Sequence, residues 1–202
     1  RPTSVLAPEE ITTFGGTGSV SFDVEFGYSG GYSPRVHGLN LPLVLNGFVD
    51  NDPTKTFSFR TTNGVTQHII SVPANQLYAR FALFDALTDG DPDDLDMYVY
   101  YCGTDGASCR KIGESGEPTS QERFDVYRPA EGLYAVMIHG FETDEVLGGP
   151  GANYQLLGWA FGVVDDKANM SASGPAFVAA GTTQTVTVDW TNLLGNTIYL
   201  GG

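Results

Sequence analysis

The sequence predicts an all-β protein, a β-sandwich or jelly roll, and three observations support this prediction. Strand-like alternation of apolar and polar residues recurs along the chain. No stretch of the sequence combines a helical period with capping residues. The 26 glycines and 11 prolines suit a chain with many tight turns. A length of 202 residues is enough for one large sandwich, or for one sandwich with a smaller module.

The expected strands follow one another in chain order. The clearest period of two covers residues 20–28, where the alternating residues are Val20, Phe22, Val24, Phe26 and Tyr28. Further strands are expected at 77–84 and 95–101, and the second of these has an apolar face and a face with Asp96, Tyr98 and Tyr100. The segments 133–139 and 154–161 are mostly apolar, which predicts buried strands, and 186–190 alternates again.

The chain divides in the sequence into a central domain, residues 51–165, and two terminal pieces, residues 1–50 and 166–202. Acidic turns at 50–53 and 165–167 bound the central domain, and we interpret both as solvated linkers. Each terminal piece alone is too short to form a stable hydrophobic core. Either the two pieces pair as a small immunoglobulin-like sandwich, or the last piece begins a further domain. We favour pairing, because an unpaired strand edge promotes aggregation.

The charge of the chain limits its partners. A formal net charge of −14 and a pI of about 4.3 argue against nucleic-acid binding, which depends on Lys and Arg meeting phosphates. The same charge argues against docking on anionic membranes, and no apolar run is long enough to span a bilayer. No signal peptide begins at Arg1, so we expect an internal cut of a longer precursor or the edge of an expressed fragment.

The most informative segment is an acidic turn that leads into the strand at 95–101. Asp89, Asp91, Asp93, Asp94 and Asp96 fall within eight residues, and folding would bring their charges closer together. A hard cation such as Ca²⁺ removes this repulsion and prefers carboxylate ligands. The sequence therefore predicts a calcium site, and the alternative is a solvated acidic turn in an acidic protein.

The turn does not form an EF-hand. Asp89, Asp91 and Asp93 have the spacing with which an EF-hand loop starts, but Asp94 and Tyr100 stand where that loop needs Gly and Glu. A calcium site made by a turn and a strand fits better. A second acidic patch in a neighbouring loop could add a ligand, and its members are Glu114, Glu117 and Glu122.

Cys102 and Cys109 flank a loop of six residues directly after an expected strand. A hairpin would bring the two sulfurs within bonding range, so we expect a disulfide and an oxidising, extracytoplasmic compartment. The Cys and His spacing that a structural zinc site needs is absent from the sequence.

No pattern in the sequence indicates an active site. The three histidines, His37, His68 and His139, accompany neither a Gly-x-Ser-x-Gly elbow nor a His-Glu-x-x-His motif, and we expect them to be structural or exposed. Glycosidase-like carboxylate pairs are possible only in loops, at 9–10 and 142–145. Tyr98 and Tyr100 share a strand face and form a possible stacking platform for a sugar or peptide, although such a pair more often covers a neighbouring sheet.

Several segments together resemble the bacterial pre-peptidase C-terminal domain, a module that follows the catalytic domain of many secreted subtilisin-like serine proteases and some metalloproteases. They are residues 72–85 (VPANQLYARFALFD), 93–100 (DDLDMYVY), 119–122 (TSQE) and 132–141 (GLYAVMIHGF). Residues 186–201 (VTVDWTNLLGNTIYLG) are similar to the terminal fibronectin-like segment of such proteases.

The resemblance implies a jelly-roll β-sandwich that commonly binds calcium and is not itself catalytic, with a smaller immunoglobulin- or fibronectin-like element beside it. It implies Asp94 and Asp96 as the first metal ligands and Asp89 and Asp91 as the next. The Ser-bearing Gly-Thr-Ser-Met motif of subtilases is absent, so the parent catalytic domain would be a partner in cis, upstream of this chain. We expect a secreted accessory region that aids stability, secretion or substrate approach. The alternative is a module that binds an extracellular polymer such as collagen, other insoluble protein or polysaccharide.

Overall fold

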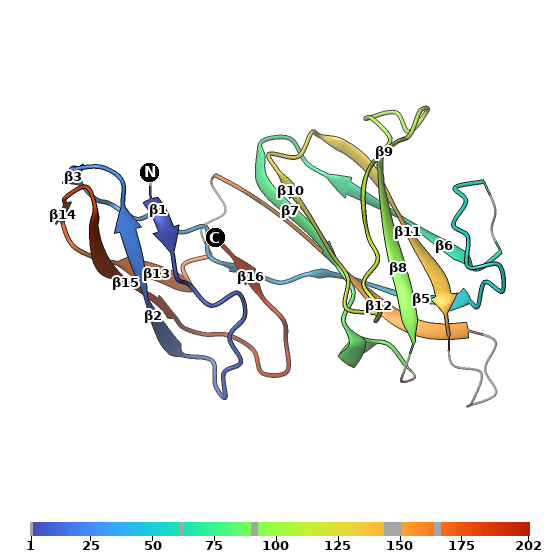
Figure 1. Cartoon of the computed structure of the whole chain (residues 1–202), viewed down its shortest axis with the longest axis horizontal. Helices are drawn as coiled ribbons and strands as arrows, with labels where there is room; N and C mark the ends of the chain where they lie inside the picture. The colour runs from blue at the N-terminus through green and yellow to red at the C-terminus, as the bar shows by residue number, and fades with distance from the viewer. Residues whose placement is uncertain (1, 61–62, 90–92, 144–150, 164–166) are drawn as a thin grey trace. The chain divides into compact units, whose positions relative to one another are not determined.

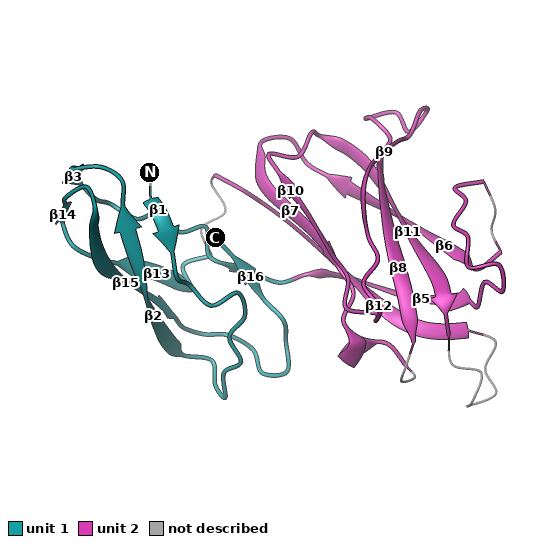
Figure 2. Cartoon of the chain, in the orientation of Figure 1, with its two compact units in different colours: residues 1–41, 164–202 teal, residues 42–163 magenta. Residues whose placement is uncertain are grey.

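The computed structural model describes residues 2–60, 63–89, 93–143, 151–163 and 167–202. These residues form antiparallel sheets, and their only helical element is one short 3-10 turn, η1 (Asp85–Leu87). The prediction of an all-β protein is therefore confirmed. The chain folds into two compact units, one from residues 42–163 and one from residues 1–41 with 164–202 (Figure 2).

The larger unit is a sandwich of two four-stranded sheets (Figure 1). In the first sheet the order is β10 (Arg123–Tyr127), β7 (Gln76–Ala82), β12 (Gly151–Gly162) and β5 (Leu43–Asp50). In the second the order is β6 (Val65–Val72), β11 (Gly132–Glu142), β8 (Asp94–Tyr101) and β9 (Arg110–Ser115). This is the strand order of a jelly roll, as predicted.

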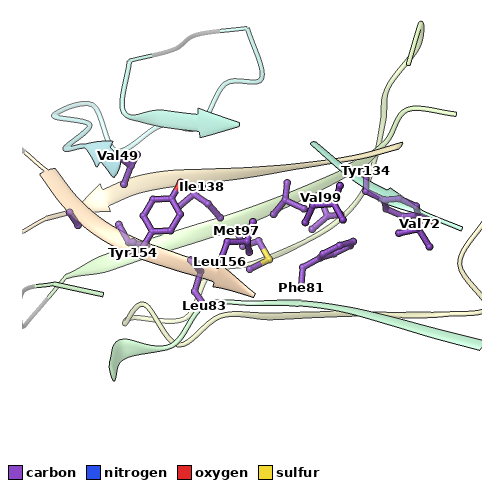
Figure 3. Close-up of a cluster of buried hydrophobic side chains, with 14 residues drawn as sticks. Val49, Val72, Phe81, Leu83, Met97, Val99, Tyr134, Ile138, Tyr154 and Leu156 are labelled. Atoms are coloured by element: carbon purple, nitrogen blue, oxygen red, sulfur yellow. The ribbon is translucent and has the colours of Figure 1, made fainter. Parts of the chain in front are cut away.

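The core of the larger unit lies between its two sheets. In β8, Leu95, Met97 and Val99 point inward and are fully buried, as the alternation of this segment requires. They meet residues of the facing sheet such as Phe81 and Leu156, and part of this cluster is shown in Figure 3. The intervening residues of β8 therefore project from the outer face of the sandwich, which fixes the position of the acidic side chains.

The boundary of the N-terminal piece was predicted wrongly. We ended this piece at residue 50, but β5 pairs with β12 from residue 43 onward and belongs to the larger unit. The inward residues of β5, Leu45 and Val49, pack on the core cluster of the larger unit, and this packing holds the strand in that unit. The turn after β5 was also wrongly interpreted as a solvated linker, because Asp52 is only 3% exposed.

The smaller unit is built around one four-stranded sheet in the order β1 (Pro2–Val5), β2 (Gly18–Phe26), β15 (Thr182–Trp190) and β13 (Met170–Ser173). The two terminal segments thus pair with each other, through nine residues of β2 and nine of β15. Two short ladders complete the unit: β3 (Gly30–Gly31) with β14 (Phe177–Val178), and β4 (Leu39–Asn40) with β16 (Leu200–Gly201).

Aromatic and aliphatic side chains fill a separate core in the smaller unit. Phe26, Val24 and Val186 are buried there, and the Tyr32 ring meets Phe26 edge-on at 5.0 Å. At the other end of the pair, Trp190 lies over Gly18, where an added Cβ would come within 2.6 Å of the indole. Trp190 can therefore pack against residue 18 only because glycine has no side chain.

Candidate functional site

An open pocket of about 600 Å³ lies on the outer face of the larger unit, at β8 and the loop between β9 and β10. We call it the acidic pocket. Its walls combine carboxylates, two aromatic rings and a short run of loop backbone, and its lining residues are Asp94, Asp96, Tyr98, Glu114, Ser115, Gly116, Glu117, Pro118 and Phe141.

The strand pattern places these side chains together. Asp94, Asp96 and Tyr98 alternate with the buried residues of β8, so all three project from the same outer face. Across the sheet, Asp94 lies opposite Glu142 of β11, and Tyr98 lies opposite Glu114 of β9. The register therefore gathers negative charge from three neighbouring strands.

Asp94 is held in an unfavourable electrostatic environment. Within the described part of the chain, its Oδ1 atom is buried and has no hydrogen-bond partner. Burial first, and then the charges of Asp96 and Glu142, raise the pKa of Asp94 to about 6. The positive charges of Lys55 and His139 lower this pKa, but burial and the neighbouring carboxylates outweigh them, so the ionised Asp94 is only partly compensated.

Glu122 shows the same effect behind the pocket wall. It is 1% exposed, and its Oε1 accepts a 2.7 Å hydrogen bond from the backbone N–H of Glu117, while Oε2 finds no partner among the residues described. Burial raises the pKa of Glu122 to about 7, and the charges of Asp96 and Glu117 act in the same direction against the lowering effect of nearby hydrogen bonds. A second buried carboxyl oxygen is therefore unsatisfied close to the pocket.

A buried histidine joins the pocket to the turn after β5. The His139 side chain on β11 is 1% exposed and lies between two carboxylates, with Nδ1 3.3 Å from Asp96 Oδ2 and Nε2 3.0 Å from Asp52 Oδ2. Burial alone would lower the pKa of His139, but its hydrogen bonds to Asp96 and Asp52 raise it above the ordinary value. Asp52 in turn accepts hydrogen bonds from Thr54 and Thr56, which close the turn.

Two lysines lie at the rim of the pocket. Lys55 pairs with Glu142 and lies 5.0 Å above the Phe141 ring, and Lys111 pairs with Glu114 and lies 4.8 Å above the Tyr98 ring. All four charged side chains are more than 40% exposed, so each pair contributes little to stability. Lys55 lowers the pKa of Asp94, but it does not outweigh burial and the charges of Asp96 and Glu142.

The structure brings together only part of the predicted ligand set. Asp94 and Asp96 line the same pocket. Asp89 instead accepts hydrogen bonds at both carboxylate oxygens from the backbone and side chain of Asn153 on β12. Asp91 lies outside the described residues. As the described side chains stand, no group of three or more His, Cys, Asp or Glu residues is arranged to hold a metal ion.

The possible stacking platform is occupied by residues of the same chain. The Phe57 ring stacks on Tyr98 with a centroid distance of 3.7 Å, and the Phe59 ring lies 4.4 Å from that of Tyr100. Both phenylalanines come from the segment between β5 and β6. Phe59 itself is 39% exposed, so the aromatic cluster still reaches the surface.

The predicted disulfide is confirmed, since Cys102 and Cys109 are bonded to each other. The bond closes the loop between β8 and β9, and Cys102 is buried beneath it. Among the other candidates, Glu142 pairs with Lys55, and residues 144–145 lie outside the described part. The pairing of Asp52 with His139 was not predicted. Which residues of distant segments lie close together, as His139 and Asp96 also do, cannot be read from either segment alone.

Comparison with known proteins gives no family. No family model matches the chain, and no curated protein matches it. Among solved structures, the chain is similar to one described as "Glycosylation Associate Protein (Gap123) complex from Streptococcus agalactiae", with 10% identity and a TM-score of 0.28. The match covers 78% of this chain and 44% of that one, so this chain spans less than half of its length. A likeness at this level carries no argument about function. Within the described residues, no helix is long and apolar enough to cross a membrane.

Proposed function

We propose that the chain is a non-catalytic, calcium-stabilised accessory region of a secreted subtilisin-like serine protease. The observation that carries the calcium part is the pair Asp94 and Asp96 in one pocket, with a buried Asp94 oxygen left unpaired among the described residues. The jelly-roll order of the larger unit is consistent with the resemblance to pre-peptidase C-terminal domains. The disulfide is not a core feature of that family, but it is consistent with an oxidising, extracytoplasmic compartment.

The carboxylate oxygens that line the pocket are the type of donor that a hard cation prefers. Asp94 and Asp96 would hold the ion, and Glu117, which lines the same pocket, offers further carboxylate oxygens. Ca²⁺ accepts six to eight oxygen ligands, including backbone carbonyls and water, so two or three carboxylates are a sufficient start. When bound, the ion supplies the positive charge that these groups lack.

Calcium would act on stability by mass action. The folded chain gathers the carboxylates from β8 and the β9–β10 loop, whereas the unfolded chain does not hold them together, so the ion binds the folded state preferentially. At a free ion concentration about 100 times the dissociation constant, the gain is about 2.7 kcal/mol. The proposed role is therefore a brace that stiffens the domain in calcium-rich surroundings.

The test is thermal unfolding in EDTA and then in excess CaCl₂. We expect a clearly lower melting temperature in EDTA and full recovery with Ca²⁺. The double substitution Asp94→Asn with Asp96→Asn should abolish this response. An unchanged melting temperature after thorough chelation would contradict the calcium part. The gene sequence upstream of this chain tests the protease part, because a parent protease requires a subtilase catalytic domain there.

The alternative function is binding of an extracellular polymer. It is favoured by the aromatic cluster of Phe57, Phe59, Tyr98 and Tyr100, which reaches the surface at Phe59. Aromatic faces are suited to stacking on sugars or peptides. Sedimentation with insoluble collagen, chitin or cellulose distinguishes the two functions. A pure brace stays in the supernatant, whereas a binding module sediments and loses this property on Phe59→Ala.

A further inference from the structure

We infer that His139 and Asp52 are positioning residues that aim the Asp96 carboxylate into the acidic pocket. This inference rests on the proposed calcium site and assigns it a set of supporting residues. It is based on the contacts of the two oxygens of Asp96, which have different surroundings.

One oxygen of Asp96 is fixed from behind. Oδ2 accepts a hydrogen bond from the Tyr98 hydroxyl at 3.2 Å and faces Nδ1 of His139 at 3.3 Å. The other oxygen, Oδ1, faces the loop backbone at Gly116, where an added Cβ would lie 2.9 Å from it. Gly116 and Asp96 both line the pocket, and we therefore take Oδ1 as the Asp96 oxygen that would meet an ion there.

The histidine is itself fixed. Its ring is fully buried, and Nε2 meets Asp52 Oδ2 at 3.0 Å. Asp52 is anchored by the backbone N–H of Thr54 at 2.9 Å and that of Thr56 at 3.2 Å. A continuous hydrogen-bonded chain therefore runs from the turn after β5 to the pocket.

This arrangement has the chemistry of a supporting shell around a metal ligand. A ligating carboxylate with one oxygen held by neighbouring donors loses less conformational freedom when the ion binds, and removal of such partners typically lowers metal affinity about 10–100-fold. We therefore expect Asp52 and His139 to strengthen calcium binding although neither lines the pocket.

Calorimetric titration with CaCl₂ tests the inference in the whole chain. The variants are Asp52→Asn, which keeps the volume of the side chain, and His139→Asn, whose amide can still donate toward Asp96. His139→Leu removes both ring nitrogens. The matched control is His68→Gln, because His68 also lies in the larger unit but bonds to Tyr154 at 2.8 Å.

We expect His139→Leu and Asp52→Asn to weaken calcium binding about 10–100-fold, with partial rescue in His139→Asn and no change in His68→Gln. Urea unfolding in EDTA, measured alongside, identifies variants that are merely unfolded. Wild-type affinity in folded variants of both Asp52 and His139 would overturn the inference and leave the proposed function standing. A wild-type chain that binds no calcium would overturn both.

If every variant fails to fold, nitrogen NMR of the wild-type histidine side chains decides the matter. We expect the His139 ring resonances to shift when CaCl₂ is added, because the ion acts on the carboxylate that His139 contacts, while those of His68 stay in place. Unmoved His139 resonances at saturating calcium would contradict the positioning role.

Discussion

Replacement of Asp94 by Asn should change stability in opposite directions with and without calcium. In the folded chain the pKa of Asp94 is raised from its ordinary value of 3.8 to about 6 by burial and by neighbouring carboxylates. Each pKa unit corresponds to about 1.4 kcal/mol, so the ionised group costs the folded state about 3 kcal/mol at pH 7.5. Solvent screening at this partly exposed site reduces the effect to about 1–2 kcal/mol.

In EDTA, Asp94→Asn should therefore raise the melting temperature by about 2–8 °C for a chain of this length. In calcium at about 100 times the dissociation constant, the wild type gains about 2.7 kcal/mol, and the variant should lose most of this gain. The assay is differential scanning calorimetry of both proteins in both buffers.

The matched control is Asp125→Asn. Asp125 accepts hydrogen bonds from Arg80 at 2.7 and 3.0 Å, and burial, which alone would raise its pKa, is outweighed by this pairing, so the pKa is lowered. Asp125→Asn should therefore destabilise the chain equally in EDTA and in calcium. If Asp94→Asn also destabilises the chain in EDTA, or keeps the full calcium response, the reasoning about an only partly compensated carboxylate is refuted.

Three further predictions concern pH, the disulfide and the aromatic cluster. The folded-state pKa of Glu122 is about 7 and its ordinary value is 4.5, so the folded state binds the proton of this carboxyl group more tightly than the unfolded state does. The contribution of Glu122 to the free energy of unfolding without calcium therefore falls as the pH rises from about 4.5 to 7. Urea unfolding of Glu122→Gln across this range should show a weaker pH dependence than the wild type. Replacing Cys102 and Cys109 by Ser should cost about 2–3 kcal/mol, measured in urea, because the bond closes a short loop. Phe57→Ala should cost about 1–3 kcal/mol in the same assay by removing the ring stacked on Tyr98; no loss would mean that this contact is not maintained in solution.

The alternation of the sequence was sufficient to predict the sandwich. In β8, Leu95, Met97 and Val99 point to the core and Asp96 and Tyr98 point away, because a strand has a side-chain period of two. The disulfide was equally predictable, since Cys102 directly follows a strand and a short loop separates it from Cys109.

The candidate site was only partly predictable, because it depends on pairing between distant segments. Asp94 and Asp96 could be placed on one face from β8 alone. The sequence distance of 87 residues between Asp52 and His139 gave no sign that they meet. Asp89 likewise bonds to Asn153, a residue of another strand, and it does not line the pocket with Asp94 and Asp96.

The boundary of the smaller unit was missed for a related reason. Residues 43–50 are largely apolar, as a strand can be, and nothing in their own composition says which sheet they join. The pairing of β5 with β12 decides this, through eight residue pairs that can be found only in the folded chain.

The central claim is that the acidic pocket binds a divalent cation. A crystal structure of the chain grown in excess CaCl₂ tests it most directly. We predict an ion in the pocket, bonded to carboxylate oxygens of Asp94 and Asp96 at about 2.3–2.6 Å. Well-ordered Asp94 and Asp96 side chains with only water between them, at saturating calcium, would contradict the account.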